Sequence, residues 1–364
     1  MRCPVSPLCL LATLSLACSG EGGGSIYSST GMSPETGSAS ASASGDGDGD
    51  TDNQSTNDTV FDFAVTDSDG EELGCKNVDF LFLVDASPSM VDEQQLLIES
   101  SAQWISTIQA ELPAAASNYR AMVVDLDDRW GHPSCDNCVN GCFYQDGSFE
   151  FDVPDYPCGY EPTACDTNLG AGVVFPAGSD ASNMDCGFPE GRRWLQADDP
   201  GVNESFACAA QVGASGSGDE QVARALRRSL DDTFQGAGGC NEGFLRDDAI
   251  LVVVIVTDED EGDFVNDQLF VEEFGPMLQQ ELYDKKGGDE NGVVVVGLIN
   301  DYGFEGVCDS PPDLAIQGAV NLREFITSFS RHELASVCAP EFITPLSSAV
   351  ATITAACDEF VPIP

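Results

Sequence analysis

The chain has 364 residues and 42% of them are hydrophobic, so it is long enough for one large domain or two ordinary ones with a substantial core. Its charge is strongly unbalanced, with 62 Asp and Glu residues against 14 Lys and Arg residues and a formal net charge of -48. Such a surface repels nucleic-acid phosphates and anionic lipid head groups, which argues against nucleic acid and favours divalent cations or basic protein surfaces as partners; the charge could also serve only to keep the chain soluble.

The N-terminus has the features of a secretory signal. One Arg precedes an apolar run from Leu8 to Ala17 that is too short to span a membrane, so we predict a signal peptide over residues 1–17. The end of this run, LSLAC, resembles a bacterial lipobox, in which Cys18 would be lipidated and would become the mature N-terminus. Ser15 stands where an aliphatic residue is usual, and the same residues suit ordinary signal-peptidase cleavage, so free secretion is the alternative.

Residues 18–71 are rich in Gly, Ser, Thr, Asp and Ala and show no hydrophobic period, so we expect a flexible acidic tether. Four Asp residues in it alternate with small residues as in a calcium loop: Asp46, Asp48, Asp50 and Asp52. An EF-hand that started at Asp46 would need Gly at its sixth position and Glu at its twelfth, where the chain has Thr51 and Asn57. The linker interpretation is therefore preferred.

Residues 72–364 form the predicted folded domain, in which apolar runs alternate with helical patterns. The apolar runs predict four strands, at Val78–Val84, Ala121–Leu126, Ala249–Val256 and Val293–Ile299. Helical spacing of apolar residues predicts five helices, at Val91–Leu112, Glu220–Leu230, Phe270–Tyr283, Leu322–Phe329 and Pro340–Cys357. Strands that alternate with helices predict an α/β fold with a doubly wound, mainly parallel sheet.

The alternation is interrupted between about residues 130 and 216, a stretch rich in Cys, Gly, Pro, Asp and Asn. Of the 15 cysteines, Cys3, Cys9 and Cys18 belong to the signal region, and twelve remain, an even number that is typical of an oxidising compartment. Seven of the twelve lie in this stretch, which we interpret as a disulfide-stapled insertion. The disulfide candidates are Cys75, Cys135, Cys138, Cys142, Cys158, Cys165, Cys186, Cys208, Cys240, Cys308, Cys338 and Cys357.

A zinc cluster is the alternative for three of these cysteines. Cys135, Cys138 and Cys142 are closely spaced, and His132 lies near them. In an exported chain with twelve cysteines available for pairing, disulfides are the preferred interpretation.

Polar side chains gather at the predicted ends of two buried strands and at the start of one helix. Asp85, Ser87 and Ser89 follow the first strand, Asp258 follows the third, and Glu220 opens the helix that precedes the third strand. In open α/β sheets ligands bind at the carboxyl ends of the strands, and hydroxyl and carboxylate oxygens suit Mg²⁺, Ca²⁺ or Mn²⁺. We therefore predict a divalent-cation site. The acids after Asp258 are expected to be exposed loop residues rather than ligands: Asp260, Glu261 and Asp263.

Asp85-x-Ser87-x-Ser89 at the end of a buried strand, together with Asp258 after another, resembles the metal-ion-dependent adhesion site of von Willebrand factor type A domains. The resemblance covers about residues 77–360, and the cysteine-rich middle resembles that of secreted myxobacterial members of the family. It implies that the two serines bind the cation directly, that the two aspartates hold it partly through water, and that a partner's Asp or Glu carboxylate completes the coordination shell.

Three loops would carry the site: the first follows the strand that ends at Val84, the second precedes the helix at residues 220–230, and the third follows the strand that ends at Val256. The second loop departs from this family pattern. The family has a Thr six residues before the Leu of an Ala-Leu helix, and counting back from Leu226 gives Glu220, with Ser217 and Asp219 as nearby alternatives. A Glu ligand would neutralise part of the metal charge and weaken its attraction for a partner carboxylate, so cation binding is expected more strongly than ligand binding through the cation. Because the chain ends lie together in this family, the resemblance also implies a disulfide between Cys75 and Cys357. A second candidate pair is Cys308 with Cys338.

An enzyme is not expected. The chain has two histidines, His132 and His332, and the sequence GASGS at residues 213–217 lacks the last Gly of a nucleophile elbow. The same stretch lacks the Lys of a phosphate loop and does not directly follow a strand. We predict an exported protein, either a lipoprotein of the outer membrane or cell surface or a secreted protein, that binds a protein ligand through a divalent cation. A structural envelope protein, in which metal and disulfides only stabilise the fold, is the alternative; an exported enzyme is a third, less favoured one.

Overall fold

The computed structural model describes residues 75–111, 118–127, 142–143, 150–151, 162–216, 220–261, 273–304, 306–309 and 318–363. Several sequence predictions concern other parts of the chain and lie outside these residues. They are the signal peptide, the acidic tether and the residues Cys18, His132, Cys135, Cys138, Cys158, Ser217, Asp219 and Asp263.

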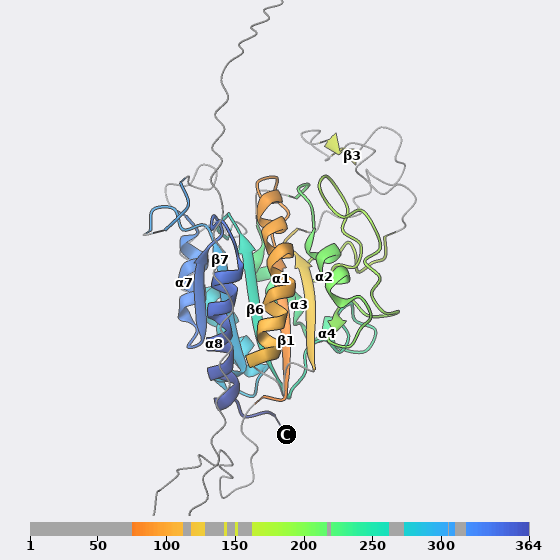
Figure 1. The fold of residues 1–364 in the computed structure, drawn as a ribbon. Helices are drawn as coiled ribbons and strands as arrows, with labels where there is room; N and C mark the ends of the chain where they lie inside the picture. Colours follow the sequence, from red (N-terminus) through yellow and green to blue (C-terminus); the bar gives the residue numbers. More distant parts are fainter. Residues whose placement is uncertain are drawn as a thin grey trace, which may run out of the picture. The chain divides into compact units, whose positions relative to one another are not determined.

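A six-stranded sheet with the order β5-β2-β1-β6-β7-β8 forms the centre of the fold (Figure 1). Its five parallel strands are β1 (Asn77–Val84), β2 (Tyr119–Asp125), β6 (Ala249–Thr257), β7 (Val293–Ile299) and β8 (His332–Ser336). The short edge strand β5 (Leu195–Gln196) pairs antiparallel with β2, and β3 (Cys142–Phe143) and β4 (Glu150–Phe151) form a separate pair. The predicted α/β fold with a doubly wound, mainly parallel sheet is confirmed.

Helices cover both faces of the sheet, which explains why its central strands are mostly apolar; the exception in β1 is Asp79, which is buried and forms an ion pair with Arg246. One face packs against α1 (Val91–Glu111), α2 (Val202–Ala210) and α8 (Ile343–Glu359). The other packs against α3 (Val222–Ser229), α6 (Gly275–Asp284) and α7 (Val320–Ser328). Two short elements complete the list, α4 (Asp232–Gln235) and the 3-10 helix η4 (Glu290–Gly292).

The strand β1 shows how successive side chains serve the two cores. Phe80 and Phe82 point to the first face, where their rings lie 5.1 and 5.6 Å from that of Trp104 in α1. Leu81 and Leu83 point to the second face, because neighbouring side chains of a strand alternate between its sides. All four side chains are buried, and each of the two layers therefore has its own hydrophobic contacts with the central strand.

Residues 162–216 of the insertion extend the domain rather than standing apart from it. They supply β5 at the sheet edge and α2, whose Phe206 ring lies 4.8 Å from that of Phe82. Trp194 and Leu195 are also buried. The sequence prediction of a stapled insertion missed these elements because their apolar residues are scattered among Gly, Pro and Asp.

Four disulfides join described cysteines: Cys75–Cys357, Cys165–Cys240, Cys186–Cys208 and Cys308–Cys338. The first and last are the two pairs expected from the sequence. Four bridges in one domain are typical of a chain that folds in an oxidising compartment outside the cytosol. Within the described residues, we find no helix with the length and apolar character needed to cross a membrane.

Candidate metal centre

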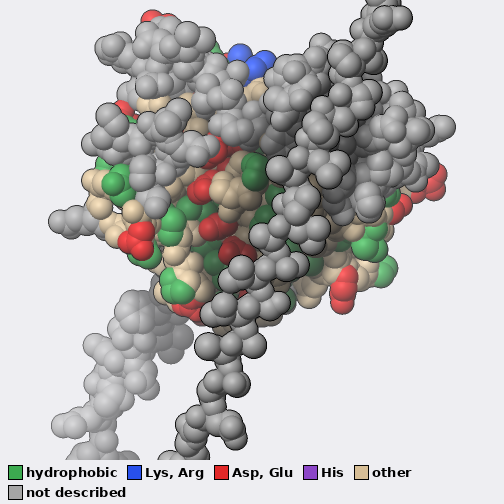
Figure 2. Space-filling view, turned by 90° about the horizontal axis from the view of Figure 1, so that it is seen from above, with side chains coloured by type: hydrophobic (Ala, Val, Ile, Leu, Met, Phe, Trp, Pro, Cys, Tyr) green, Lys and Arg blue, Asp and Glu red, His purple; other side chains and the backbone are tan. Residues whose placement is uncertain are grey.

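The strands β1 and β6 are neighbours, and their carboxyl ends meet at the upper edge of the sheet in Figure 1. From β1 the chain crosses through α1 to β2, whereas from β6 it continues to β7 on the other side. In doubly wound sheets a crevice opens where the chain divides in this way, and ligands bind there. Asp85 follows β1 and Asp258 follows β6, so both lie at this point. Figure 2, which looks onto this edge, shows Asp and Glu side chains gathered in the middle of the face.

The first loop places two hydroxyl groups side by side. The Ser87 amide donates to Asp85 Oδ1 at 2.6 Å and closes a tight turn directly after β1. This turn brings the Oγ atoms of Ser87 and Ser89 to 3.1 Å from each other. Asp85 and Ser87 are buried and Ser89 is exposed, so the pair of hydroxyls connects the interior with the surface.

The third loop meets the first through two side-chain contacts. Ser89 Oγ donates to Asp258 Oδ1 at 3.1 Å, across 169 residues of sequence. Thr257, the last residue of β6, donates from Oγ1 to Asp85 Oδ2 at 2.6 Å. The structure therefore brings together four of the five predicted ligand residues, and Thr257 is a fifth member of the group that the sequence analysis did not identify.

Glu220 of the second loop is an unpartnered carboxyl group beside this cluster. Its side chain is 1% exposed, and both carboxyl oxygens have no hydrogen-bond partner within the described part of the chain. Burial raises the pKa of Glu220 well above its usual value, and the negative charges of Asp85 and Glu259 raise it further. Burial also raises the pKa of Asp85 to about 6, although the hydrogen bonds from Thr257 and Ser87 oppose this effect.

This donor set fits a hard divalent cation. Two serine hydroxyls and several carboxylates are oxygen donors of the kind that Mg²⁺, Ca²⁺ and Mn²⁺ prefer. A buried carboxyl group without a partner is costly, and a cation would compensate it. Among the described residues no three His, Cys, Asp or Glu side chains form a metal-binding group by themselves, so the candidate centre depends on Ser87 and Ser89 as much as on its acids.

Comparison with known proteins gives only remote similarities. No protein-family model matches the chain, and no curated protein matches it. Among solved structures, proximal thread matrix protein 1 from the mussel byssus is 12% identical, with a TM-score of 0.36 over 78% of this chain and 49% of that one. Its structure with a zinc-occupied MIDAS motif is 14% identical, with a TM-score of 0.35 over 79% and 49%. Human COPII-coat protein Sec24c is 10% identical, with a TM-score of 0.32 over 78% and 33%.

The chain thus spans about half, or less, of the proteins that it resembles in structure. At these identities and scores, the candidate centre is argued from its own geometry.

The second loop is fastened to the first by a buried glutamine. Gln94 of α1 is 2% exposed, and its Nε2 donates to the carbonyl oxygens of Asp85 and Gly213, both at 2.8 Å. Its Oε1 accepts from the Gly213 amide at 3.0 Å, and the Gly216 amide donates to the Ala86 carbonyl at 2.8 Å. A Cβ on Gly216 would lie 2.7 Å from that carbonyl oxygen, so only glycine permits this approach. The glycines of the GASG sequence therefore serve loop packing.

The acids after Asp258 hold the starts of two helices. Glu261 is 3% exposed, and its Oε2 accepts from the Ala223 amide at 2.7 Å, at the beginning of α3. Asp260 is half-buried and accepts from the amides of Asn321 and Leu322, each at 3.0 Å, at the beginning of α7. The prediction that these two acids are exposed loop residues is wrong.

The reason for that error lies in the helix starts. Free amides and the positive end of the dipole at a helix N-terminus attract carboxylates. The N-cap residues of α3 and α7 are Gln221 and Ala319, and neither makes a capping hydrogen bond through its side chain. A predicted helix without a capping residue is thus the sequence signal that could have indicated a remote carboxylate.

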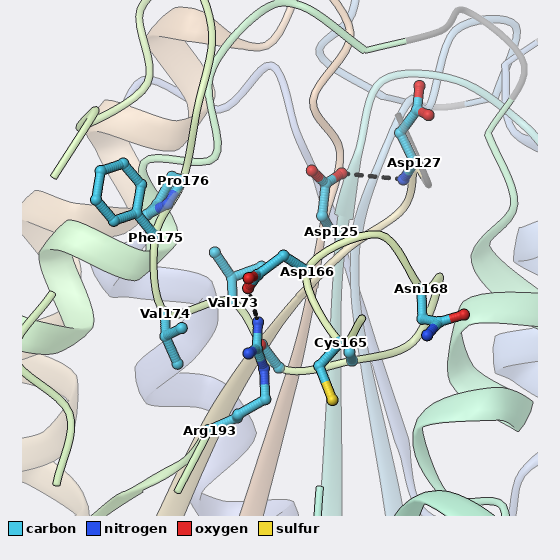
Figure 3. Close-up of a pocket in the computed structure, with 12 residues that line it drawn as sticks. Asp125, Asp127, Cys165, Asp166, Asn168, Val173, Val174, Phe175, Pro176 and Arg193 are labelled. Carbon is cyan, nitrogen blue, oxygen red and sulfur yellow. Dashed lines mark hydrogen bonds and ion pairs between the residues drawn. The ribbon is translucent and has the colours of Figure 1, made fainter. Parts of the chain in front are cut away.

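A small pocket at the end of β2 adds negative charge to the same edge of the sheet (Figure 3). Asp125, Asp127 and Asp166 line it, and Arg193 forms an ion pair with Asp166 and donates to the Gly172 carbonyl at 2.5 Å. Although burial acts to raise the pKa of Asp166, the ion pair lowers it. The pocket holds about 20 Å³, room for about one water, and Arg193 already provides a cationic partner there. We therefore interpret it as a structural feature.

Proposed function

We propose that the chain is an exported protein-interaction module of the von Willebrand factor type A kind, which binds a divalent cation at the carboxyl edge of its sheet. The observation that carries the proposal is the position of Ser89 Oγ, 3.1 Å from Ser87 Oγ and 3.1 Å from Asp258 Oδ1. Three oxygens from two distant loops converge there at the chain's topological switch point. The proposed ligands are Asp85, Ser87, Ser89, Glu220 and Asp258.

Each of these residues has a distinct part in holding the cation. Ser87 and Ser89 supply neutral oxygens, and Asp258 faces them from the third loop. Asp85 lies behind the serines and is oriented by the Ser87 amide and the Thr257 hydroxyl. When bound, the cation supplies an open coordination position to an oxygen of a protein ligand. Mg²⁺ is the proposed ion, with Ca²⁺ and Mn²⁺ as alternatives of the same hardness.

Glu220 sets how strongly such a ligand is held. Each additional carboxylate near the cation cancels part of its positive charge. We therefore propose that an Asp or Glu of the partner protein binds here more weakly than it would if a neutral hydroxyl stood at position 220.

Binding is proposed rather than catalysis. The converging side chains of the candidate centre are hydroxyls and carboxylates, and proton transfer in enzymes more often uses His. Of the two histidines, His332 begins β8 and so lies at the opposite edge of the sheet, where its Nδ1 is 2.6 Å from the Phe329 carbonyl oxygen. His132 lies outside the described residues.

The oxidising environment indicated by the four disulfides agrees with an exported protein. We propose that the chain belongs to the cell envelope of a bacterium of the myxobacterial type. In this proposal a lipid at Cys18 anchors it to the outer membrane or cell surface, and free secretion is the alternative.

A thermal-shift titration of the full chain with Mg²⁺, Ca²⁺ and Mn²⁺ tests the cation site. A ligand at 100 times its Kd stabilises the folded state by about 2.7 kcal/mol, which raises the melting temperature of a domain of this size by roughly 5 °C. We expect this shift in the wild type and in Ser106→Ala, whose exposed hydroxyl bonds only within α1, and we expect none in a Ser87→Ala/Ser89→Ala variant. An equal shift in the double variant would contradict the site.

The protein-interaction part is tested by capture from a cell-surface extract with and without EDTA. Loss of the captured protein in EDTA, and in the double serine variant, supports binding through the cation. Capture that survives both treatments, with the thermal shift intact, would show that the cation only stabilises the fold.

A further inference from the structure

Helix α3 carries a compact group of cations in a chain that has few of them. Arg224, Arg227 and Arg228 are three of only 14 Lys and Arg residues, against 62 acids. All three are exposed, whereas Val222 and Leu226 on the other side of the helix are fully buried against the sheet. Positions three and four residues apart share one face of a helix, so the guanidinium groups point to the same side. This face therefore attracts anions in spite of the charge of the whole chain.

The arginines line a trough that is large enough for a ligand. This trough is a groove of about 510 Å³ bordered by all three of them together with Leu169, Asp231, Thr233 and Phe274, so its lining has three cations and one acid. A second groove of about 490 Å³ adjoins it at Arg227 and Asp231, but its lining has four acids against two cations and does not favour an anion: Asp231, Asp232, Glu281 and Asp284 against Arg227 and Lys285. The volume of the trough falls in the range of known ligand sites. A single phosphate ion would fill only a small part of this trough.

All three guanidinium groups have partners within the domain, and Arg224 Nη1 donates to Gln221 Oε1 at 2.9 Å. Arg227 and Arg228 keep donors for a ligand. Arg227 donates from Nε and Nη2 to the Glu281 carboxylate at 2.8 and 2.9 Å, which leaves its Nη1 group for another acceptor. Arg228 lies over the Phe234 ring at 5.3 Å and donates weakly to Asn168 Oδ1 at 3.5 Å. Both partners of Arg228 are neutral, so its charge is not compensated by them. A planar guanidinium that is already oriented loses little freedom when it pairs with a carboxylate.

We propose that this trough binds an extended acidic segment of a partner protein. Carboxylates at alternate positions of such a segment would pair with Arg224 and Arg228, and its backbone would lie along Leu169 and Phe274. The spacing supports this: side-chain origins on one helix face are about 5–6 Å apart, and alternate side chains of an extended chain about 6.5–7 Å apart. The net charge of -48 repels the segment at long range, but at physiological salt this repulsion is screened beyond about 8 Å.

A labelled peptide tests the proposal in the full chain. The probe is a fluorescein-labelled peptide in which Asp alternates with Gly over eight residues, and its control is the same peptide with Asn in place of every Asp. Anisotropy is measured with protein freed of metal on a chelating resin, so that the proposed cation site takes no part, its failure would not affect the result, and no soluble polycarboxylate competes for the arginines. We expect weak binding of the acidic peptide, with a Kd of about 1 mM or lower, and no binding of the amide peptide.

The contribution of the arginines is measured with matched variants. In Arg224→Gln/Arg228→Gln the affinity is expected to fall at least about tenfold, whereas Arg323→Gln/Arg331→Gln, which removes two charges elsewhere, leaves it unchanged. Arg228→Lys keeps the charge but loses the planar fork, and an intermediate affinity is expected. Melting temperatures establish that each variant folds.

Three results would overturn the proposal. They are equal binding of the acidic peptide to wild type and to Arg224→Gln/Arg228→Gln, equal binding of the amide peptide, and displacement of the acidic peptide by inorganic phosphate at the same concentration. The last would show a site for small anions instead of a polypeptide.

Discussion

Replacing Glu220 by Gln should stabilise the protein without metal and remove its response to metal. The wild-type side chain buries a carboxyl group whose two oxygens lack hydrogen-bond partners within the described residues. Its pKa in the folded state is raised, first by burial and then by Asp85, so the folded state binds this proton more tightly than the unfolded chain does. The stability that the proton provides is complete below the unfolded pKa of 4.5 and is lost as the pH rises through the folded value.

Glutamine has nearly the same shape and cannot ionise, so Glu220→Gln avoids this loss at high pH. The amide would be buried without partners as well, so the difference between the two proteins comes from the raised pKa alone: in EDTA at pH 8 we expect the variant to be the more stable, by about 1.4 kcal/mol for each unit by which folding raises the pKa. The gain should shrink toward pH 5, where the wild-type carboxyl is protonated. In saturating Mg²⁺ the order reverses, because the wild type gains about 2.7 kcal/mol at 100 times its Kd and the variant gains little.

Urea unfolding at pH 5 and pH 8, each in EDTA and in Mg²⁺, measures all four free energies of unfolding. The control is Glu99→Gln, which removes one exposed carboxylate from α1 and should change stability by less than about 0.5 kcal/mol under every condition. The reasoning fails if Glu220→Gln is less stable than the wild type in EDTA at pH 8. It also fails if the variant keeps the full Mg²⁺ response, because Glu220 would then not be a ligand.

Three further predictions concern the site and its frame. Mg²⁺-induced stabilisation should grow between pH 5 and pH 7, because Asp85, with a pKa of about 6, must lose its proton before it can hold the cation. In EDTA the free energy of unfolding should fall by up to about 3 kcal/mol as the pH rises through the pKa of Asp85. A thermal-shift series that shows neither trend would contradict this prediction. Gln94→Glu loses both amide donors and should cost about 2–4 kcal/mol in urea unfolding, against less than about 0.5 kcal/mol for Gln95→Glu on the exposed side of the same helix, and equal costs would refute the role of Gln94. Replacing Cys75 and Cys357 by Ser opens a loop of 282 residues and should cost about 4–5 kcal/mol, whereas a cost below about 1 kcal/mol would show that the chain ends stay together without the bridge.

The sequence was sufficient to predict the parts of the fold that depend on continuous apolar runs. Strands β6 and β7 are buried on both sides and almost entirely apolar, and β1 is apolar from Phe80 to Val84, with one buried acid before it, Asp79, that pairs with Arg246. β8 was missed because it is an edge strand of half-buried residues, and its sequence HELAS has neither an apolar run nor a clear alternation. β5 is two residues long and exists only because β2 offers a free edge, which no local pattern reveals.

The candidate centre divides in a similar way. Asp85, Ser87, Ser89 and Asp258 were predictable because each lies within five residues of a strand end, and the parallel sheet places those ends together. Gln94 could not be found in this manner. Its role depends on the carbonyl group of Gly213, 119 residues away, and on the burial of the Gln94 amide away from water. Polar residues that fasten loops to each other are specified by the packed fold, so they become visible only in the structure.

The fastening of the second loop bears on how the centre would work. Its start is tied to the first loop through Gln94, and the helix that follows it is tied to the third loop through Glu261. Glu220 lies between these two ties and is buried, and the negative charge of Asp85 adds to the effect of burial in raising its pKa. A bound cation would stabilise the charged form that burial and Asp85 disfavour. The loops that carry the proposed ligands are already held together by these contacts, so the site avoids the cost of assembling them when a cation binds. A variant that loosens the loop, such as Gln94→Glu, should therefore weaken cation binding even though Gln94 is not among the proposed ligands.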